Sequence, residues 1–197
     1  MKKLLACILL LAAPLVAQSY RGPGASPAAT SLAFETSLGY TYFAMDTPSQ
    51  QRVFLSGVDA NAFVDLNARW GVLANSSYAR TGDVFGTGHS GNVFSLLCGP
   101  EFYPVAYANT RMFVHSMAGV SMVDSAVPVS GTYYLSGAVA RFSYAVGGGV
   151  DHPLFGPFTL RVGGDYVRTT FADPTATMRF QNNLRLVTSV SYRFRKR

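Results

Sequence analysis

The chain has 197 residues, of which 49% are apolar and only 13% are charged, and its formal net charge is +6. Charged residues make up about a quarter of ordinary soluble proteins, and a chain this apolar is not disordered. A helical membrane protein is not expected either, because the only long apolar run, residues 4–17, is too short to span a bilayer. The length suits one sizeable domain.

The N-terminus has the features of a secretory signal peptide: two lysines, an apolar run and a small residue suited to cleavage. We expect a signal peptide at residues 1–17, a flexible segment rich in Pro, Gly and Ala at 18–30, and one folded domain at 31–197. Removal of the signal peptide takes Cys7 away, so Cys98 remains alone and no intramolecular disulfide can form. The remaining positive charge is too modest and too dispersed to indicate nucleic-acid binding.

Apolar and polar residues then alternate with a period of two, as in half-buried β-strands. We identify eight such segments, at about 32–42, 58–70, 72–80, 94–103, 111–122, 141–151, 158–166 and 183–194. In the first, Leu38, Tyr40 and Tyr42 share one face, opposite Glu35 and Ser37. Four segments carry more than one charge, and in each of them the charges fall on one face, which random placement would rarely produce.

The connections between these segments alternate in length. The first, third, fifth and seventh are long, at about 44–57, 82–90, 124–137 and 169–181. The other three are tight, around 70–71, 104–110 and 152–157. Long connections at one end and short turns at the other describe an all-β, eight-stranded antiparallel up-and-down barrel with one elaborated rim.

Alternation alone leaves open which face points outward, because a soluble lipocalin-like carrier would also have eight strands with one apolar face. Two features favour an apolar outer face in a membrane. Aromatic residues of that face gather near the segment ends, where interfacial girdles lie. The polar face has no lysine, and its six acids balance its six arginines, which suits paired charges in a confined interior.

We therefore predict a transmembrane barrel whose interior is filled by paired charges, since eight strands enclose just enough space for side chains. Such an interior would act as a plug and leave no large open channel. The predicted interior network consists of Glu35, Asp59, Asp65, Arg69, Glu101, Arg111, His115, Arg141, Asp151, Arg161, Asp165, Arg185 and Arg193.

Short motifs follow one another in a fixed order along the later segments: Gly99-Pro100, Phe113-Val114-His115, Gly147 to Asp151, Leu160-Arg161-Val162 and Asn182 to Arg185. In these motifs the sequence resembles, from about residue 31 to 194, the small eight-stranded outer-membrane barrels of OmpA type. The resemblance implies an outer-membrane location and recognition by the barrel-assembly machinery through Tyr192 and Phe194 in the last segment. The chain departs from the family pattern by continuing past Phe194 with three basic residues.

The sequence offers little for a nucleotide or metal site. Residues 86–91 match a dinucleotide-binding fingerprint by letter, but they lie between two predicted strands instead of before a helix. His89, His115 and His152 are spread over both ends and the middle of the predicted barrel, so they do not make a common zinc site. We expect no metal and no cofactor.

A hydrolase would need a serine, a histidine and an acid within hydrogen-bond reach. Ser116 directly follows His115, so the two side chains point to opposite faces of one strand and cannot form a dyad. A combination across strands of His115 with Asp151 and Ser143 stays open. We expect no catalytic site.

The predicted function is that of an outer-membrane protein, not an enzyme, with a structural, adhesive or surface-interaction role carried by four long extracellular loops and with periplasmic termini. The alternatives are a lipid-modifying enzyme of the outer membrane and a soluble lipocalin-like carrier with the faces inverted. Guanidinium groups bind phosphates by charge-assisted hydrogen bonds, and the candidate contacts for lipopolysaccharide are Arg52, Arg80, Arg168 and Arg179. The expected partners are outer-membrane lipids, lipopolysaccharide and the barrel-assembly machinery, whereas the sequence leaves the oligomeric state open.

Overall fold

The computed structural model describes residues 33–46, 52–86, 88–104, 106–107, 110–130, 133–172 and 178–194. The expected signal peptide, the expected lead-in segment and the three basic residues that end the chain lie outside the described residues. Within the described part of the chain, no helix is long and apolar enough to cross a membrane.

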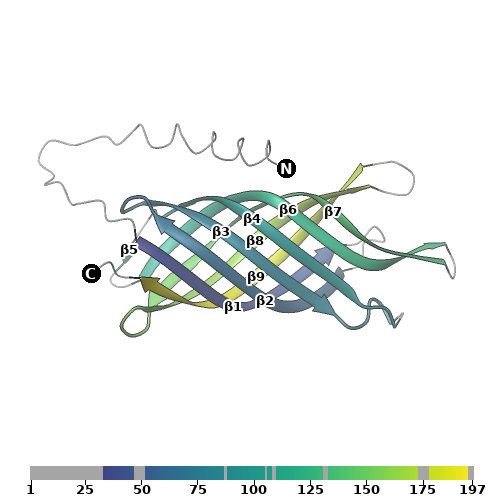
Figure 1. Ribbon diagram of the computed structural model, residues 1–197, viewed down its shortest axis with the longest axis horizontal. Coiled ribbons are helices and arrows are strands. Elements are labelled where there is room, and N and C mark those ends of the chain that lie inside the picture. The colour runs from purple at the N-terminus through teal and green to yellow at the C-terminus, as the bar shows by residue number, and fades with distance from the viewer. Residues whose placement is uncertain are drawn as a thin grey trace, which may run out of the picture. The chain divides into compact units, whose positions relative to one another are not determined.

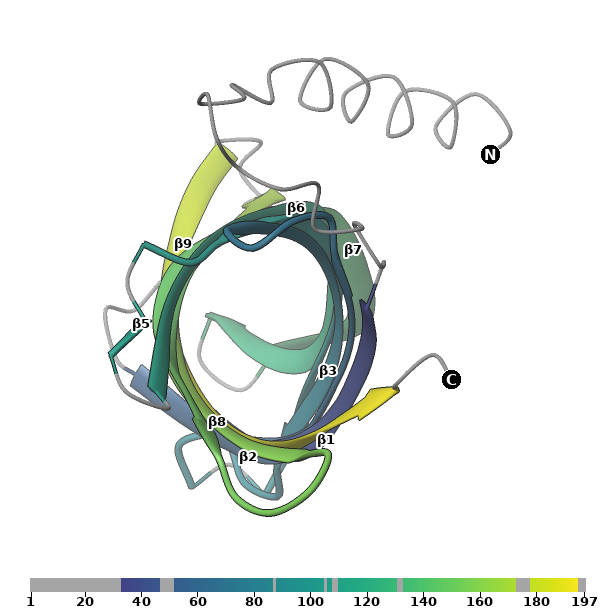
Figure 2. The ribbon, with the colours of Figure 1, turned by 90° about the vertical axis from the view of Figure 1, so that its left-hand side faces the viewer.

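The described residues form nine strands, all paired antiparallel in one sheet. They are β1 (Ala33–Asp46), β2 (Arg52–Asp65), β3 (Trp70–Thr81), β4 (Gly91–Phe102), β5 (Ala106–Tyr107), β6 (Thr110–Ser130), β7 (Tyr133–Pro153), β8 (Phe158–Ala172) and β9 (Met178–Phe194). Eight of them close into an up-and-down barrel, because β1 pairs with β9 and β4 pairs with β6 (Figures 1 and 2). The two residues of β5 lie in the β4–β6 connection and pair with β6. Closure pairs the backbone of every barrel strand on both sides, and the predicted fold is confirmed.

The strands are longer at one end than the alternation indicated. We call this the loop end, where residues 47–51, 82–90, 131–132 and 173–177 join the strands. The predicted bounds of three of the four long loops, 44–57, 124–137 and 169–181, are therefore wrong, because strands extend into each of them. The hairpin of β6 and β7, each 21 residues long, stays paired out to Ser130 and Tyr133, because an extended ladder satisfies backbone groups that a loop would leave open. The register shifts next to Pro128, which has no N–H to donate.

At the opposite end, the turn end, residues 66–69, 103–109 and 154–157 join the strands. The first of these turns differs from the prediction, since Trp70 begins β3. Asn67 Oδ1 accepts hydrogen bonds from the backbone N–H groups of Arg69 and Trp70, both at 2.9 Å, a common use of asparagine in turns. The chain thus reverses before Trp70, so Arg69, which the alternation assigned to the inner face, belongs to the turn and not to a strand.

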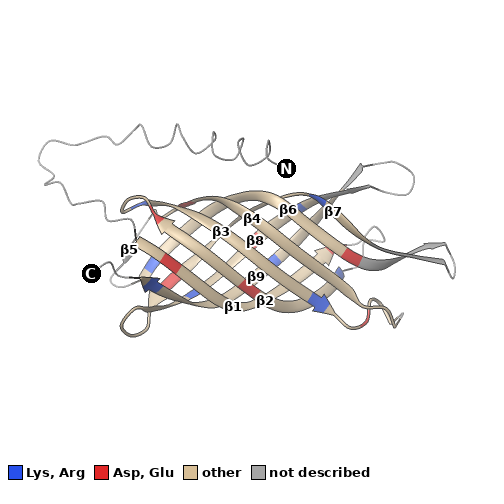
Figure 3. Ribbon diagram, viewed as in Figure 1, with Lys and Arg blue, Asp and Glu red and all other residues tan. Residues whose placement is uncertain are grey.

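The apolar face of the alternation points outward. Leu38, Val58 and Phe142 are 69, 57 and 58% exposed, whereas Asp59 and Ser143 on the other face are buried. Figure 3 shows that charged positions are few along the ribbon of the strands. A carrier with its faces inverted is therefore excluded.

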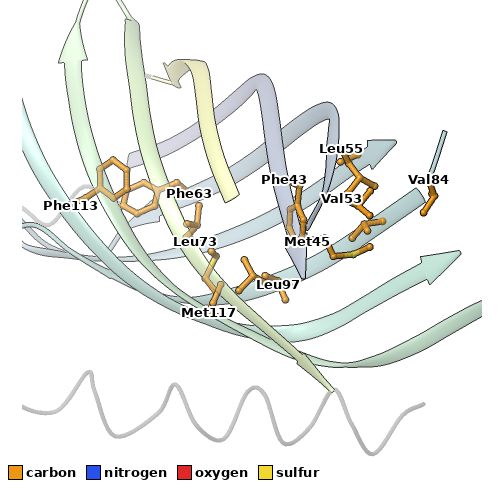
Figure 4. Close-up of a cluster of buried hydrophobic side chains, with 14 of the residues drawn as sticks. Phe43, Met45, Val53, Leu55, Phe63, Leu73, Val84, Leu97, Phe113 and Met117 are labelled. Carbon is orange, nitrogen blue, oxygen red and sulfur yellow. The ribbon is translucent and has the colours of Figure 1, made fainter. Parts of the chain in front are cut away.

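The interior contains an apolar zone that the sequence analysis did not predict. The part of it toward the loop end, which we call the apolar cap, consists of Phe43, Met45, Val53, Leu55 and Val84 (Figure 4). Other members of the same cluster lie among the polar groups of the interior: Phe63, Leu73, Leu97, Phe113 and Met117. Val84 comes from the β3–β4 connection, which folds back so that the Val84 N–H donates to the carbonyl of His89 at 2.8 Å. The interior is therefore not uniformly polar as predicted, and toward the loop end it is filled by inward apolar side chains, of which Met45, Val53 and Leu55 fall in a segment expected to be loop.

Candidate functional site

The polar interior is built from charges on directly opposed residues of neighbouring strands. The register places opposite each other Arg111 and Asp151, Asp151 and Arg161, Glu101 and His115, Asp165 and Arg185, and Glu35 and Arg193. Opposite charges in such positions stabilise strand pairs. A slip of one residue would turn all of these side chains toward the outer face, so the pairs specify the register as well as fill the interior.

Arg161 on β8 is the centre of this arrangement. Its Nε donates to Asp151 Oδ1 at 2.8 Å and its Nη2 donates to Glu101 Oε1 at 2.5 Å. The guanidinium also lies over the Phe113 ring, 4.1 Å from the centroid. Arg161 is buried, so water does not solvate its charge. The carboxylates of Asp151 and Glu101 balance that charge instead.

His115 joins two parts of the interior. Its Nδ1 lies 3.3 Å from Glu101 Oε2, and its Nε2 lies 2.7 Å from Asp165 Oδ1. Both ring nitrogens therefore face carboxylate oxygens, and the imidazole connects the Arg161 cluster to the acid that Arg185 binds. The prediction that His115 points inward agrees with this placement.

The glycine run of β7 provides the space for these groups. A Cβ on Gly147 would lie 2.0 Å from Asp165 Oδ1, and a Cβ on Gly149 would lie 2.7 Å from the Phe113 ring. Neither separation is possible between real atoms. A side chain at Gly147 would displace Asp165, and one at Gly149 would also meet the Val162 carbonyl oxygen of β8, at 2.1 Å. The glycines that appeared in the sequence as a family motif thus allow the β7 backbone to lie close to Asp165 and to Phe113.

Arg185 extends the network across the barrel. Its Nε and Nη2 donate to Asp165 Oδ2 at 2.7 and 2.5 Å, and its Nη1 donates to Asn75 Oδ1 at 2.6 Å. Asn75 Nδ2 donates in turn to Asp59 Oδ2 at 2.7 Å, and Asn61 Nδ2 donates to Asp59 Oδ1 at 2.6 Å. Within the described part of the chain, Asp59 is therefore held by two amides and not by an arginine.

Hydrogen bonds and ion pairs thus run without interruption from Asp151 to Ser37, whose hydroxyl accepts from Asn61 at 2.9 Å. Each of the eight barrel strands contributes at least one side chain. In strand order these are Ser37, Asp59, Asn75, Glu101, His115, Asp151, Arg161 and Arg185. Beside His115 and Arg185 the side chains leave a cavity of about 30 Å³, room for a water molecule. We call all the side chains joined in this way from Asp151 to Ser37 the interior network.

Two further groups close the turn end. Arg193 binds Glu35 at 3.1 Å and Asp65 at 3.3 Å. Tyr103, in the connection after β4, points back into the barrel and donates to Glu101 Oε1 at 2.7 Å, while Arg111 lies over its ring at 4.3 Å. Burial raises the pKa of the Tyr103 phenol, and the neighbouring Glu101 carboxylate raises it further, so the phenol keeps its proton.

The side chains of two residues of the predicted network, Arg69 and Arg141, take part neither in the interior network nor in the groups at the turn end. Arg69 is exposed in the turn at 66–69, because the chain reverses there. Arg141 donates to the carbonyl of Ala140 at 3.0 Å and has no ion pair among the described residues. Its opposite residue on β6 is Ser121, and the β7–β8 ladder begins only at Ser143, so no carboxylate faces Arg141.

The sequence analysis missed the roles of Asn75 and Ser77. They lie on the predicted segment at 72–80, where apolar and polar residues alternate less regularly than elsewhere, although both share the parity of the buried Leu73. Ser77 Oγ accepts a hydrogen bond from Arg185 Nη1 at 3.1 Å. The sequence signal for their role was their polarity on the inner face, opposite the polar residues of the neighbouring strand, because Asn75 pairs with Asn61 and Ser77 with Asp59.

The combination of His115, Asp151 and Ser143 is not assembled. The ring of His115 contacts Glu101 and Asp165, and the buried Ser143 hydroxyl has no hydrogen-bond partner among the residues that the structure describes. The described histidines, cysteine and acids contain no group of three that would bind a metal.

The outer arginines lie near the loop end. Arg52 and Arg80 are exposed, and Arg52 Nε binds Asp46 Oδ1 at 3.0 Å. Arg168 packs against the Phe180 ring, 3.8 Å from the centroid, and its Nη1 lies 3.4 Å from the Tyr144 hydroxyl. These three arginines share the outward parity of Phe54, Tyr78 and Tyr166, whereas the side chain of Arg179 lies outside the described residues.

Tyr192 and Phe194 lie on the outer face of β9, and their rings are 4.8 Å apart. They face away from the interior network, so whatever binds them approaches from outside the barrel.

Comparison with known proteins identifies solved structures with the same fold. No protein-family model and no curated protein sequence matches the chain. Among solved structures, Neisserial surface protein A (NspA) matches with a TM-score of 0.65 and 9% identity, over 82% of this chain and 99% of that one. Ail, the attachment invasion locus protein of Yersinia pestis, matches at 0.58 and 16%, over 83% and 99%. The outer membrane protein OprG of Pseudomonas aeruginosa matches at 0.55 and 11%, over 85% and 98%. The chain has the fold of these small barrels.

Proposed function

We propose that the chain is an outer-membrane barrel of OmpA type, with a structural and surface-interaction role and without enzymatic activity. The observation that carries this proposal is the distribution of polarity: apolar side chains cover the outside of a closed barrel, and the interior network occupies its inside. In lipid, a closed barrel satisfies its backbone hydrogen bonds internally, and an outward apolar band is what lipid requires. In water, the exposure of this large apolar surface would carry a free-energy cost that no other contact offsets.

The proposed barrel conducts no large solute. From the turn end inward, the closing groups are Arg193 and Tyr103, then the interior network, and then the apolar cap. Eight strands leave an interior that side chains can fill, and each of these layers would have to move to open a path.

Surface interaction is the proposed role for the loop end. The hairpin of β6 and β7 extends past its neighbours, since β4 pairs with β6 only as far as Ser125 and β8 pairs with β7 only as far as Ser143 (Figure 1). The structural neighbour Ail has been solved in complex with the heparin analogue sucrose octasulfate, which is compatible with a binding role for barrels of this fold. The termini would then be periplasmic, with Tyr192 and Phe194 presented to the assembly machinery.

Lipopolysaccharide is the proposed lipid partner. Arg52, Arg80 and Arg168 lie on the outer face near the loop end, above outward aromatic residues, where lipid phosphates would meet them. Replacing Arg80 and Arg168 together by alanine should reduce the lipopolysaccharide that co-purifies with the barrel. The same change at Arg69, exposed at the turn end, should leave it unaltered. Equal co-purification in all three proteins would contradict the assignment.

The test of the whole proposal uses the chain without its first 17 residues, folded into detergent micelles. We expect an unheated sample to migrate as a compact species, heating to shift it, and folding to require detergent. Planar bilayers containing it should show no stable nanosiemens openings. Solubility without detergent would contradict the membrane location, and large steady openings would contradict the closed interior.

A further inference from the structure

The turn between β7 and β8 is unusually apolar for a turn. Residues 154–157 read Leu-Phe-Gly-Pro, without the Asn, Asp or Ser that commonly accompany Gly and Pro in turns. Phe155 is 71% exposed and Leu154 is 46% exposed. The turn at 66–69, at the same end of the barrel, contains Asn67 and an exposed Arg69 instead.

The position of Phe155 is fixed by the turn. The Leu154 N–H donates to the Phe158 carbonyl and the Phe158 N–H donates to the Phe155 carbonyl, both at 3.0 Å. Gly156 has a φ of +56°, a conformation that glycine adopts at no steric cost. The backbone therefore holds an exposed phenylalanine in a defined place outside the barrel.

Phe155 is also the first member of a row of rings around the turn end. The centroids of Phe155 and Phe158 are 5.3 Å apart, those of Phe158 and Tyr192 are 5.4 Å apart, and Tyr192 follows Phe194 at 4.8 Å. Phe34 on β1 ends the row, 5.4 Å from Phe194. The row connects the turn directly to the outward aromatic side chains of β8, β9 and β1.

We propose that the β7–β8 turn is a membrane anchor, with Leu154 and Phe155 inserted among lipid acyl chains instead of standing in water. The inference rests on the proposed membrane location of the barrel. Continuity of the ring row selects lipid as the occupant, because the same row joins the turn to the apolar surface that lipid covers. The absence of any charge in the turn removes the cost that insertion of a turn such as 66–69 would carry.

The test exploits the single tryptophan of the chain. Trp70 is replaced by phenylalanine, and a new tryptophan is placed at one of three positions: F155W in the anchor, A68W in the polar turn at the same end, and L38W in the outward face of β1. Each protein is folded into vesicles of phosphatidylcholine with or without bromine on the acyl chains. Bromine quenches the emission of tryptophan that touches the chains, whereas iodide in the buffer quenches tryptophan in water.

We expect brominated lipid to quench F155W to a degree comparable with L38W and to quench A68W far less, with iodide giving the reverse order. If brominated lipid quenches the L38W protein but not the F155W protein, the anchor is overturned and the proposed membrane barrel is not. This holds both when iodide quenches the F155W protein and when another protein chain shields its tryptophan from iodide. Equal lipid quenching of A68W and F155W would also overturn it, because the apolar turn would then have no special position. An unquenched L38W protein would refute the membrane location itself.

Discussion

Replacing Arg185 by methionine tests the energetic importance of the interior network. Arg185 is 1% exposed, and its guanidinium donates to Asp165, Asn75 and Ser77. Methionine fills much of the same volume but leaves Asp165 with His115 as its remaining partner and leaves Asn75 Oδ1 without this donor. Breaking a buried ion pair from one side costs about 3–5 kcal/mol. With a urea dependence of about 2 kcal/mol per molar, the unfolding midpoint should fall by about 2 M.

The assay is equilibrium urea unfolding of the barrel in vesicles, followed by circular dichroism and by the heat-dependent gel shift. The matched control is Arg69→Met, which removes an exposed arginine of a turn and should change stability by less than about 0.5 kcal/mol. In the double variant with Asp165→Asn, much of the loss should be recovered, because no buried carboxylate is left uncompensated. An Arg185→Met variant as stable as the Arg69→Met variant would refute the reasoning.

Three other changes test separate parts of the barrel. Gly147→Ala should destabilise it by about 1–3 kcal/mol, because the new Cβ meets Asp165 Oδ1, whereas Gly82→Ala has open space and should not; equal unfolding midpoints would contradict the close packing at Gly147. Phe43→Ala with Leu55→Ala should cost several kcal/mol, about 2–5 for each side chain, yet planar bilayers should still show no large conductance, since the interior network remains; stable openings would place the barrier in the apolar cap alone. The pKa of Tyr103 is raised on folding, so its contribution to stability is complete below the unfolded pKa of about 10 and declines as pH rises above it. Tyr103→Phe should therefore lose less stability than the native chain between about pH 9 and about pH 11, and parallel pH profiles would contradict this.

The outline of the barrel could be predicted from the sequence because charge reveals parity. Glu35, Asp165 and Arg185 are each costly on a lipid-facing surface, so their positions identify the inner face of three strands without any structural information. The same reasoning placed His115 inside. It could not identify the actual partners, because these depend on the register, and only the register brings His115 opposite Glu101 and Asp165 opposite Arg185.

The errors have physical causes as well. Alternation carries no signal of where the chain reverses, so Arg69 was assigned to a face that its turn does not have. Inward apolar residues such as Met45 and Leu55 do not match a polar inner face, and they were therefore assigned to the loop expected at 44–57. Arg141 has the inward parity but no acid opposite it, which shows that parity alone does not make an ion pair.

The most direct measurement of the outward apolar surface is a nitroxide scan along β1. With Cys98 replaced by serine, single cysteines at residues 36 to 42 are spin-labelled in the folded barrel in lipid vesicles, and collision with oxygen and with a water-soluble nickel complex is measured by EPR. Oxygen accessibility should be high at Leu38, Tyr40 and Tyr42 and low at Ser37 and Thr41, with a period of two residues. High accessibility to the nickel complex at Leu38, Tyr40 and Tyr42 would contradict a barrel that is apolar outside and polar within. Oxygen accessibility that does not alternate along β1 would contradict it as well.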